Sequence, residues 1–462
     1  KNFTTTLNTK LDGVAASANN YSLTLSADGG DDGEINIYKI NSDGSVAWCK
    51  RIDGVDERIH TPTLCSTTTS SADDIFLWFR TIDGSTSGSS NRRRVLRFNS
   101  SGVEQNEREY ATPNLQSEYY TYRPTTNKVY DDGTNIYIAG KSVGGRLTGG
   151  SAGSSGAFWT KIQKSDASFQ AEFISSGYGG SNYGRGPVFV DGSGNHSLTK
   201  TDAQHAPRHM FCKYNSSNQK VFEKYYGYHS GGSHQPDTCE FRGGVVTGGQ
   251  HIMACSLATS GETNISNDYH MSLLKLDPSD GSVTFWVRAI AAESDGFQLQ
   301  DCAVDSSGNI YAVGWGKVGS DNKQSLWCGK FNSSGVKQWN VTLGLADDSV
   351  ALNPQGIDVD NSGNVYFVGY INNVVGTFNA DTTTYTQGII MKVADGDAPT
   401  AGTTGIWKIT NTDFAFASTP TASAYNNADS NLIGAPTQIS DASASDVTLD
   451  NETGQSVTLV TV

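Results

Sequence analysis

The histidines are the first residues in this chain whose types and spacing could serve chemistry. Seven of the eight lie between residues 196 and 270. His205, His209 and Cys212 are close in sequence, and imidazole and thiolate groups are ligands that zinc and copper accept. Their spacing fits no zinc finger, and Pro207 interrupts any helix that would align His205 with His209. We therefore expect surface and loop histidines, with no metal site and no cofactor.

Two short motifs resemble catalytic or metal-binding loops. Residues 149–153 match the G-x-S-x-G nucleophile elbow, which needs a strand before it and a helix after it. Here the motif lies in a Gly/Ser-rich loop over residues 143–156. Residues 358–363 resemble the start of a calcium loop, but Gly369 occupies the twelfth position, where such a loop needs Glu. The sequence thus predicts no catalytic residue and no enzyme.

The remaining acidic and amide residues belong to a repeated turn. Residues 305–314 read DSSGNIYAVG, residues 360–369 read DNSGNVYFVG, and residues 131–140 read DDGTNIYIAG. Asp, Asn and Gly tolerate the left-handed backbone of a tight hairpin. The alternating run after the turn is typical of a half-buried strand. These residues are therefore predicted to build a hairpin.

The repeat determines the predicted fold. The residue that ends each turn recurs every 54 to 61 residues, at Asn20, Asp74, Asn135, Asn195, Gln250, Asn309 and Asn364. A second turn follows, as in residues 40–48 and 331–339, so each repeat holds four antiparallel strands. We predict an all-β, seven-bladed β-propeller of four-stranded antiparallel blades over residues 1–416. An array of separate domains is disfavoured, because each unit is too small to bury its own core.

Composition limits the possible partners. The net charge is −14, which disfavours binding to nucleic acid. No apolar stretch reaches the ~18 residues of a membrane-spanning helix, so we expect no membrane insertion. The basic cluster Arg92–Arg94 with Arg97 alternates with apolar residues and is expected to form a solvated strand face. The seven scattered cysteines are expected to be small buried residues without disulfides.

The chain changes character after residue 416. Residues 417–462 lack Trp and Cys and end in the β-prone run 456–462. We predict a C-terminal arm that pairs with a neighbouring subunit, with a loose extension as the alternative. Two segments are candidates for the strand that closes the ring, Asn2–Leu7 and Ile406–Phe416.

Tyrosine-rich connections are the best candidate binding site. Three of them join the outer strand of one blade to the inner strand of the next, so they are expected to share one rim. Tyrosines beside Gly and Asn form adaptable recognition surfaces for glycans or proteins. The candidate residues are Tyr119, Tyr120, Tyr122, Tyr178, Tyr183, Tyr225, Tyr226 and Tyr228. Ordinary packing between blades is the alternative.

Residues 304–314 and 330–339 resemble the repeats of bacterial-type β-propellers with a D-x-x-G-N-x-Y-x-x-G signature. They also resemble large virion structural proteins of marine tailed phages, notably cyanophages, in which a Ser/Thr/Ala/Asp-rich stretch follows such repeats. Residues 417–462 look like that stretch. The resemblance gives no catalytic residues, because the motif is structural.

The phage resemblance implies a function. It implies a non-enzymatic virion structural and interaction module, as a tail, fibre or decoration component of an extracellular particle. Such a module would bind sibling virion proteins or a cell-surface glycan, as a homo-oligomer or within a larger assembly. Two alternatives stay open, a secreted propeller polysaccharide lyase or hydrolase and a bacterial surface adhesin or filament subunit.

Overall fold

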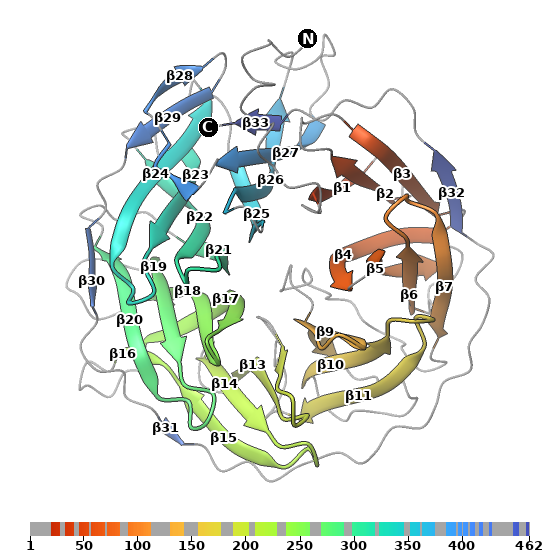
Figure 1. Cartoon of the computed structure of the whole chain (residues 1–462), viewed down its shortest axis with the longest axis horizontal. Helices are drawn as coiled ribbons and strands as arrows, with labels where there is room; N and C mark the ends of the chain where they lie inside the picture. Colours follow the sequence, from red (N-terminus) through yellow and green to blue (C-terminus); the bar gives the residue numbers. More distant parts are fainter. Residues whose placement is uncertain are drawn as a thin grey trace.

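The computed structural model of the chain is a ring of β-sheets (Figure 1). Nearly all described residues lie in strands, and no helix among them is long and apolar enough to cross a membrane. The structure describes residues 20–27, 33–40, 46–54, 57–69, 72–83, 91–111, 130–142, 156–176, 188–202, 208–228, 237–258, 269–290, 298–318, 323–345, 352–360, 363–374, 385–393, 396–399, 401–404, 407–411, 415–418, 425–426, 447–451 and 459–461.

The strands form seven sheets, numbered in chain order. Sheet 1 contains β1 (Asn20–Ala27), β2 (Gly33–Ile40) and β3 (Val46–Gly54). Sheet 2 contains β4 (Glu57–Thr69), β5 (Ala72–Asp83), β6 (Asn91–Phe98) and β7 (Glu104–Ala111). Sheet 3 contains β8 (Tyr130–Asp131), β9 (Asn135–Ser142), β10 (Gly156–Gln163) and β11 (Phe169–Ser176).

The other four continue around the ring. Sheet 4 contains β12 (Phe189–Val190), β13 (His196–Asp202), β14 (Arg208–Tyr214) and β15 (Lys220–Tyr225), and sheet 5 contains the short β16 (Gly227–Tyr228) followed by β17 (Asp237–Thr247), β18 (Gln250–Ala258), β19 (Tyr269–Leu276) and β20 (Val283–Ile290). Sheet 6 contains β21 (Gln298–Val304), β22 (Ile310–Val318), β23 (Lys323–Phe331) and β24 (Lys337–Leu345). Sheet 7 contains β25 (Leu352–Val359), β26 (Val365–Val374) and β27 (Tyr385–Val393).

Sheets 2 to 6 each contain four consecutive antiparallel strands, so the chain is an all-β propeller with four-stranded antiparallel blades. Sheets 1 and 7 are different. Among the described residues, sheet 1 has the second to fourth strands of its repeat, from Asn20, and sheet 7 has the first three. The prediction of seven complete blades from successive repeats is therefore wrong at the two ends of the ring. In sheet 7 the C-terminal segment supplies the outer strand, and in sheet 1 it adds a strand outside β3.

The repeated turn is held together by its own aspartate. In sheet 6, Asp305 Oδ1 accepts hydrogen bonds from the backbone N–H groups of Ser307 at 2.9 Å and Asn309 at 2.8 Å. Its Oδ2 accepts from Asn309 Nδ2 at 2.8 Å and from the Tyr311 hydroxyl at 3.1 Å. Burial raises the pKa of Asp305, but these hydrogen bonds outweigh it and hold the pKa below its usual value. Gly308 has φ +81°, the left-handed conformation that the turn requires.

We expect Asp305→Ala to lower the free energy of unfolding by about 1.5–3 kcal/mol, because the carboxylate accepts several charge-assisted hydrogen bonds. Chemical denaturation measures the loss. Asp358→Ala is the matched control, since that exposed carboxylate accepts one bond, from the N–H of Val359. Equal losses in the two variants would contradict the structural role of the repeated aspartate.

The last glycine of the repeat accommodates a bulge in the first strand. The register of β21 shifts between Leu299 and Asp301, opposite Gly314 in β22. A Cβ atom at Gly314 would overlap the carbonyl oxygen of Gln298. Sheet 7 repeats the arrangement, with the bulge after Pro354 opposite Gly369. This backbone contact explains why the signature ends in glycine in these two repeats.

Apolar side chains fill the spaces between neighbouring sheets. Six clusters are described, one at each junction from sheets 1–2 to sheets 6–7. Five cysteines are free and buried among these layers, which confirms the prediction of small buried residues for Cys49, Cys212, Cys255, Cys302 and Cys328. The side chains of Cys65 and Cys239 lie outside the described residues.

The C-terminal segment adds strands to the outside of the ring (Figure 1). We call β29 to β33 the outer belt; it pairs in turn with β24, β20, β15, β3 and β27, against the chain order of the sheets. The segment comprises β28 (Gly402–Thr404), β29 (Trp407–Asn411), β30 (Ala415–Ser418), β31 (Tyr425–Asn426), β32 (Val447–Asn451) and β33 (Leu459–Thr461).

The outer belt corrects two predictions. Its described strands pair with the chain's own sheets, so the prediction of an arm on a neighbouring subunit is wrong for them. The segment Ile406–Phe416 does not complete sheet 7, because Trp407–Asn411 pairs with β24 in sheet 6. The other candidate, Asn2–Leu7, lies outside the described residues. Sequence patterns missed this pairing because it joins segments far apart in the chain.

Candidate functional site

The structure describes three of the candidate tyrosines, and the side chain of one of them. Tyr225 and Tyr228 lie in β15 and β16, where only the backbone is described. Tyr226, between them, is 0% exposed, so its assignment to an exposed rim is wrong. The other candidates lie outside the described residues: Tyr119, Tyr120, Tyr122, Tyr178 and Tyr183.

Tyr226 is buried because a partner for its hydroxyl lies in the next sheet. The hydroxyl donates to the carbonyl oxygen of Gly281 at 2.7 Å, in the second turn of sheet 5. Its ring packs edge-on against Phe241, with centroids 6.0 Å apart. Buried tyrosines need such a hydrogen bond. Tyr226 thus links sheets 4 and 5 and is a packing residue.

The strands around the tyrosine-rich connections place their ends on one face of the ring. The tight turns with Gly133, Gly194, Gly308 and Gly363 mark one face, which we call the turn face. Because neighbouring strands are antiparallel, the outer strands end and the next inner strands begin on the opposite face, the loop face. The three tyrosine-rich connections join such strand ends. We take the loop face as the candidate interaction surface.

A repeated contact on the turn face joins several described sheets to the next. In sheet 6, the Lys330 ammonium and the Trp339 indole N–H both donate to the carbonyl oxygen of Gly396, each at 3.1 Å. In sheet 1, Lys39 and Trp48 donate to the carbonyl of Ser100 at 2.7 and 3.2 Å. In both sheets, a cation and an indole N–H thus contact the same carbonyl oxygen of the next sheet.

Other junctions use the same cation position. It lies one residue before the end of the third strand, and its side chain reaches the turn of the next sheet. These cations are Arg97 to Ser165, Lys213 to Pro278 and Lys275 to Ser333. The sequence signal is a Lys or Arg two residues before the Asn or Asp of the second turn, and the predictions from sequence did not include it.

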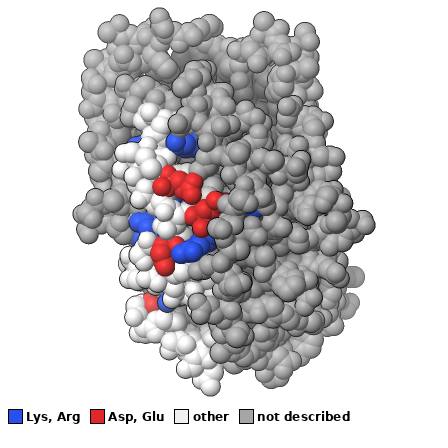
Figure 2. Space-filling model, turned by 90° about the vertical axis from the view of Figure 1, so that its right-hand side faces the viewer, with Lys and Arg blue, Asp and Glu red and all other residues white. Residues whose placement is uncertain are grey.

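The outer wall of sheet 2 carries charges of both signs. Figure 2 shows acidic and basic side chains close together on this side of the ring. β7 contributes Glu104, Glu107 and Arg108, and the Arg108 Nε donates to the carbonyl of Asp166 at 3.3 Å. Arg94 is 0% exposed and lies 3.5 Å from Glu107, so its expected place on a solvated face is wrong. Charged residues on an edge strand disfavour strand addition.

Histidines and cysteines do not assemble a metal site in the described part of the chain, where no group of three potential ligands comes together. His205 lies outside the described residues, and Cys212 is buried in the core between sheets 3 and 4. His196 is buried among aromatic rings, with Phe173 at 4.7 Å and Trp159 at 5.0 Å between centroids. Burial lowers the pKa of His196 to about 4, so this imidazole is neutral at pH 7.

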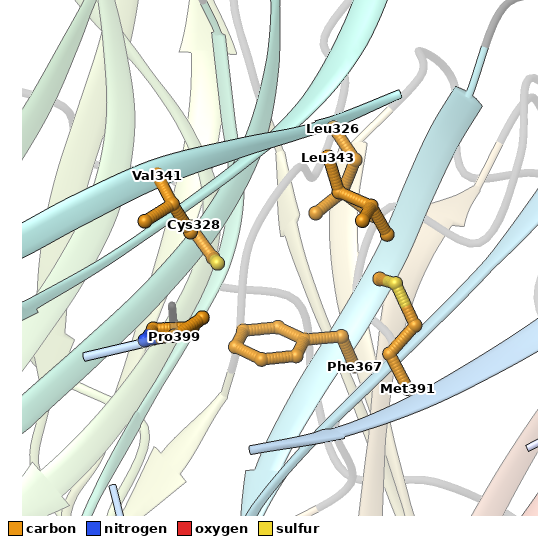
Figure 3. A pocket seen from close by; sticks show the side chains of 7 residues that line it. All are labelled: Leu326, Cys328, Val341, Leu343, Phe367, Met391 and Pro399. Atoms are coloured by element: carbon orange, nitrogen blue, oxygen red, sulfur yellow. The ribbon is translucent and has the colours of Figure 1, made fainter. Parts of the chain in front are cut away.

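One small cavity lies between sheets 6 and 7 (Figure 3). The side chains around it are apolar: Leu326, Cys328, Val341, Leu343, Phe367, Met391 and Pro399. Burial raises the pKa of the Cys328 thiol, which makes the thiol an inert packing group. A recognition site needs a few convergent polar groups, and this lining has none. The cavity is therefore a packing space within the core.

Comparisons with known proteins give distant similarities only. No family model and no curated protein sequence matches the chain. Its structure is similar to BamB from Moraxella catarrhalis, with 9% identity, a TM-score of 0.39, and coverage of 79% of this chain and 98% of that one. It is also similar to a protein of unknown function from Dyadobacter fermentans, with 11% identity, a TM-score of 0.40, and coverage of 73% and 98%. Likenesses at this level carry no functional argument.

Proposed function

We propose that the protein is a non-enzymatic structural and interaction module on the outside of an extracellular particle, as a tail, fibre or decoration component of a phage virion. It binds sibling virion proteins or a cell-surface glycan through the loop face. The observation that carries this proposal is the use of the repeated aspartates. The aspartates of the repeated turn are the chain's most frequent group that could serve catalysis. Asp305, Asp360 and Asp132 each accept a hydrogen bond from the tyrosine hydroxyl of their own repeat, so they stabilise their turns instead.

Burial of the other reactive side chains that the structure describes supports the same proposal. His196 and His251 lie within the ring, at 2% and 6% exposure, where they cannot exchange protons with a bound substrate. The five described free cysteines are buried as well. Binding through extended loops on a rigid propeller requires none of these groups. The tyrosine-rich connections are the chain's largest clusters of residues suited to such contacts.

The triple variant Tyr119→Ser, Tyr120→Ser and Tyr122→Ser tests the loop face. We expect it to retain the parent's thermal unfolding midpoint but to lose at least about tenfold in affinity, because large contact residues are lost. The probes are an array of bacterial surface polysaccharides and, for assembly, sedimentation of the chain alone.

Tyr226→Phe is the matched control. It removes the hydrogen bond to the Gly281 carbonyl, so it should reduce stability by about 1–3 kcal/mol and leave binding unchanged. Unchanged binding and assembly in the triple variant would reduce the loop tyrosines to packing residues. Shortened polysaccharide products after incubation with the parent chain would favour a lyase or hydrolase instead.

A further inference from the structure

The two ends of the repeat array meet at the junction between sheets 7 and 1. An apolar cluster joins each pair of consecutive sheets from 1–2 to 6–7. Among the described residues no such cluster joins sheet 7 to sheet 1, where β1 contacts β27. In the part of the chain that the structure describes, each of these two sheets has three consecutive strands of the repeat. A propeller ring must be held at this point, because here the two ends of the repeat array meet.

Two strands of the outer belt lie on either side of this junction. β32 pairs antiparallel with β3 in sheet 1, from Lys50 opposite Asn451 to Gly54 opposite Val447. β33 pairs parallel with β27 in sheet 7. Only residues 452–458 separate these two strands. One short segment is therefore hydrogen-bonded to both sheets.

The register of β32 fits the edge that it occupies. Leu449 lies opposite Ile52, a residue with 0% exposure in the core between sheets 1 and 2. Asp450 lies opposite Arg51, and opposite charges at facing positions favour that register. A shift by one residue in either direction would place Leu449 opposite a charged residue, Arg51 or Asp53. The sequence of this strand thus matches the outer edge of β3.

We propose that β32 and β33 together form a clasp that closes the ring from outside, with the outer edges of β3 and β27 as its binding sites. The clasp adds β33 outside β27 in sheet 7 and β32 outside β3 in sheet 1. Strand addition brings main-chain hydrogen bonds to both edges at once. Because the same segment holds both sheets, the two ends of the array cannot separate without breaking one set of those bonds.

Cysteine pairs in the full chain test the register. Arg51→Cys with Asp450→Cys, and Ala289→Cys with Phe416→Cys, join positions that face each other in β3–β32 and β20–β30. We expect each pair to form a disulfide within one chain, because facing residues lie within bridging distance. The crossed pair Arg51→Cys with Phe416→Cys is the control and should not form one. Non-reducing electrophoresis and peptide mapping identify the bonds.

A missing Arg51–Asp450 disulfide, or one formed only between two chains, would overturn closure by the chain's own clasp. Proline variants test whether the clasp holds the ring. Thr448→Pro and Leu449→Pro should each be measured, because in an edge strand alternate N–H groups face the partner. At least one should lower the unfolding midpoint of the full chain, whereas Ala442→Pro, before β32, should not. Unchanged midpoints in both variants would mean that the segment docks without closing the ring.

Discussion

Replacing Gly314 by alanine is expected to destabilise the protein by about 1–3 kcal/mol, because the new Cβ would meet backbone rather than a side chain. The added atom would overlap the Gln298 carbonyl oxygen and would lie 3.0 Å from Leu299 Cα. Strand β21 would have to move away from β22, and its bulge joins sheets 6 and 7 through Asp301, which accepts the N–H of Ile357 at 3.2 Å. Chemical denaturation followed by tryptophan fluorescence measures the loss.

Gly192→Ala is the control for this prediction. No atom lies within 4 Å of a Cβ at Gly192. An alanine there restricts the unfolded chain and should leave stability unchanged or raise it by up to about 1 kcal/mol. If Gly314→Ala matched Gly192→Ala, the bulge would not explain why the repeat ends in glycine.

Acid should begin to destabilise the ring near pH 6.5, before most carboxylates titrate. Burial lowers the pKa of His196 and of His251 to about 4, from 6.5. The positive charge of Lys213 lowers the pKa of His251 further, whereas Asp191 opposes the shift at both histidines and Asp277 opposes it at His251. The unfolded chain therefore binds more protons than the folded chain between about pH 6.5 and 4. Stability is complete above this window and is lost as the pH falls through it.

Each histidine should cost about 1.4 kcal/mol per pH unit within the window. The equivalent position in sheets 3 and 6 is Ile136 and Ile310, so His196→Ile and His251→Ile are natural replacements. Each single variant should remove about half of the slope of the unfolding free energy against pH within this window, and the double variant should remove most of it. Denaturation curves from pH 7 to 4 provide the measurement. An unaltered slope in the double variant would contradict the claim that these two imidazoles cause the loss of stability in acid.

Local features of the fold were predictable from sequence. The turn of Asp305, Gly308 and Asn309 is encoded by five consecutive residues and is observed as a hairpin. The register marks of the repeat lie at the start of the second strand, as Asn135 and Gln250 do in β9 and β18. Spacing sufficed here because both the turn and the strand alternation are local properties.

Contacts between sheets were not predictable in the same way. Tyr226 lies in a run that reads as a loop, and only the position of Gly281 in the next sheet explains its burial. Arg94 alternates with apolar residues as a surface strand would, yet Glu107 on the neighbouring strand accompanies it in the interior. The outer belt pairs Asp450 with Arg51, about 400 residues away in the chain, and no local pattern specifies such a partner.

The central claim is that the repeated polar residues serve folding and the loop tyrosines serve binding. Measuring stability and polysaccharide binding on the same two variants tests it most directly. Asp305→Ala should lower the unfolding midpoint and, below that midpoint, keep the parent's binding. The triple serine variant at Tyr119, Tyr120 and Tyr122 should keep the midpoint and lose binding. Loss of binding in folded Asp305→Ala, or a lowered midpoint with full binding in the triple variant, would contradict the account.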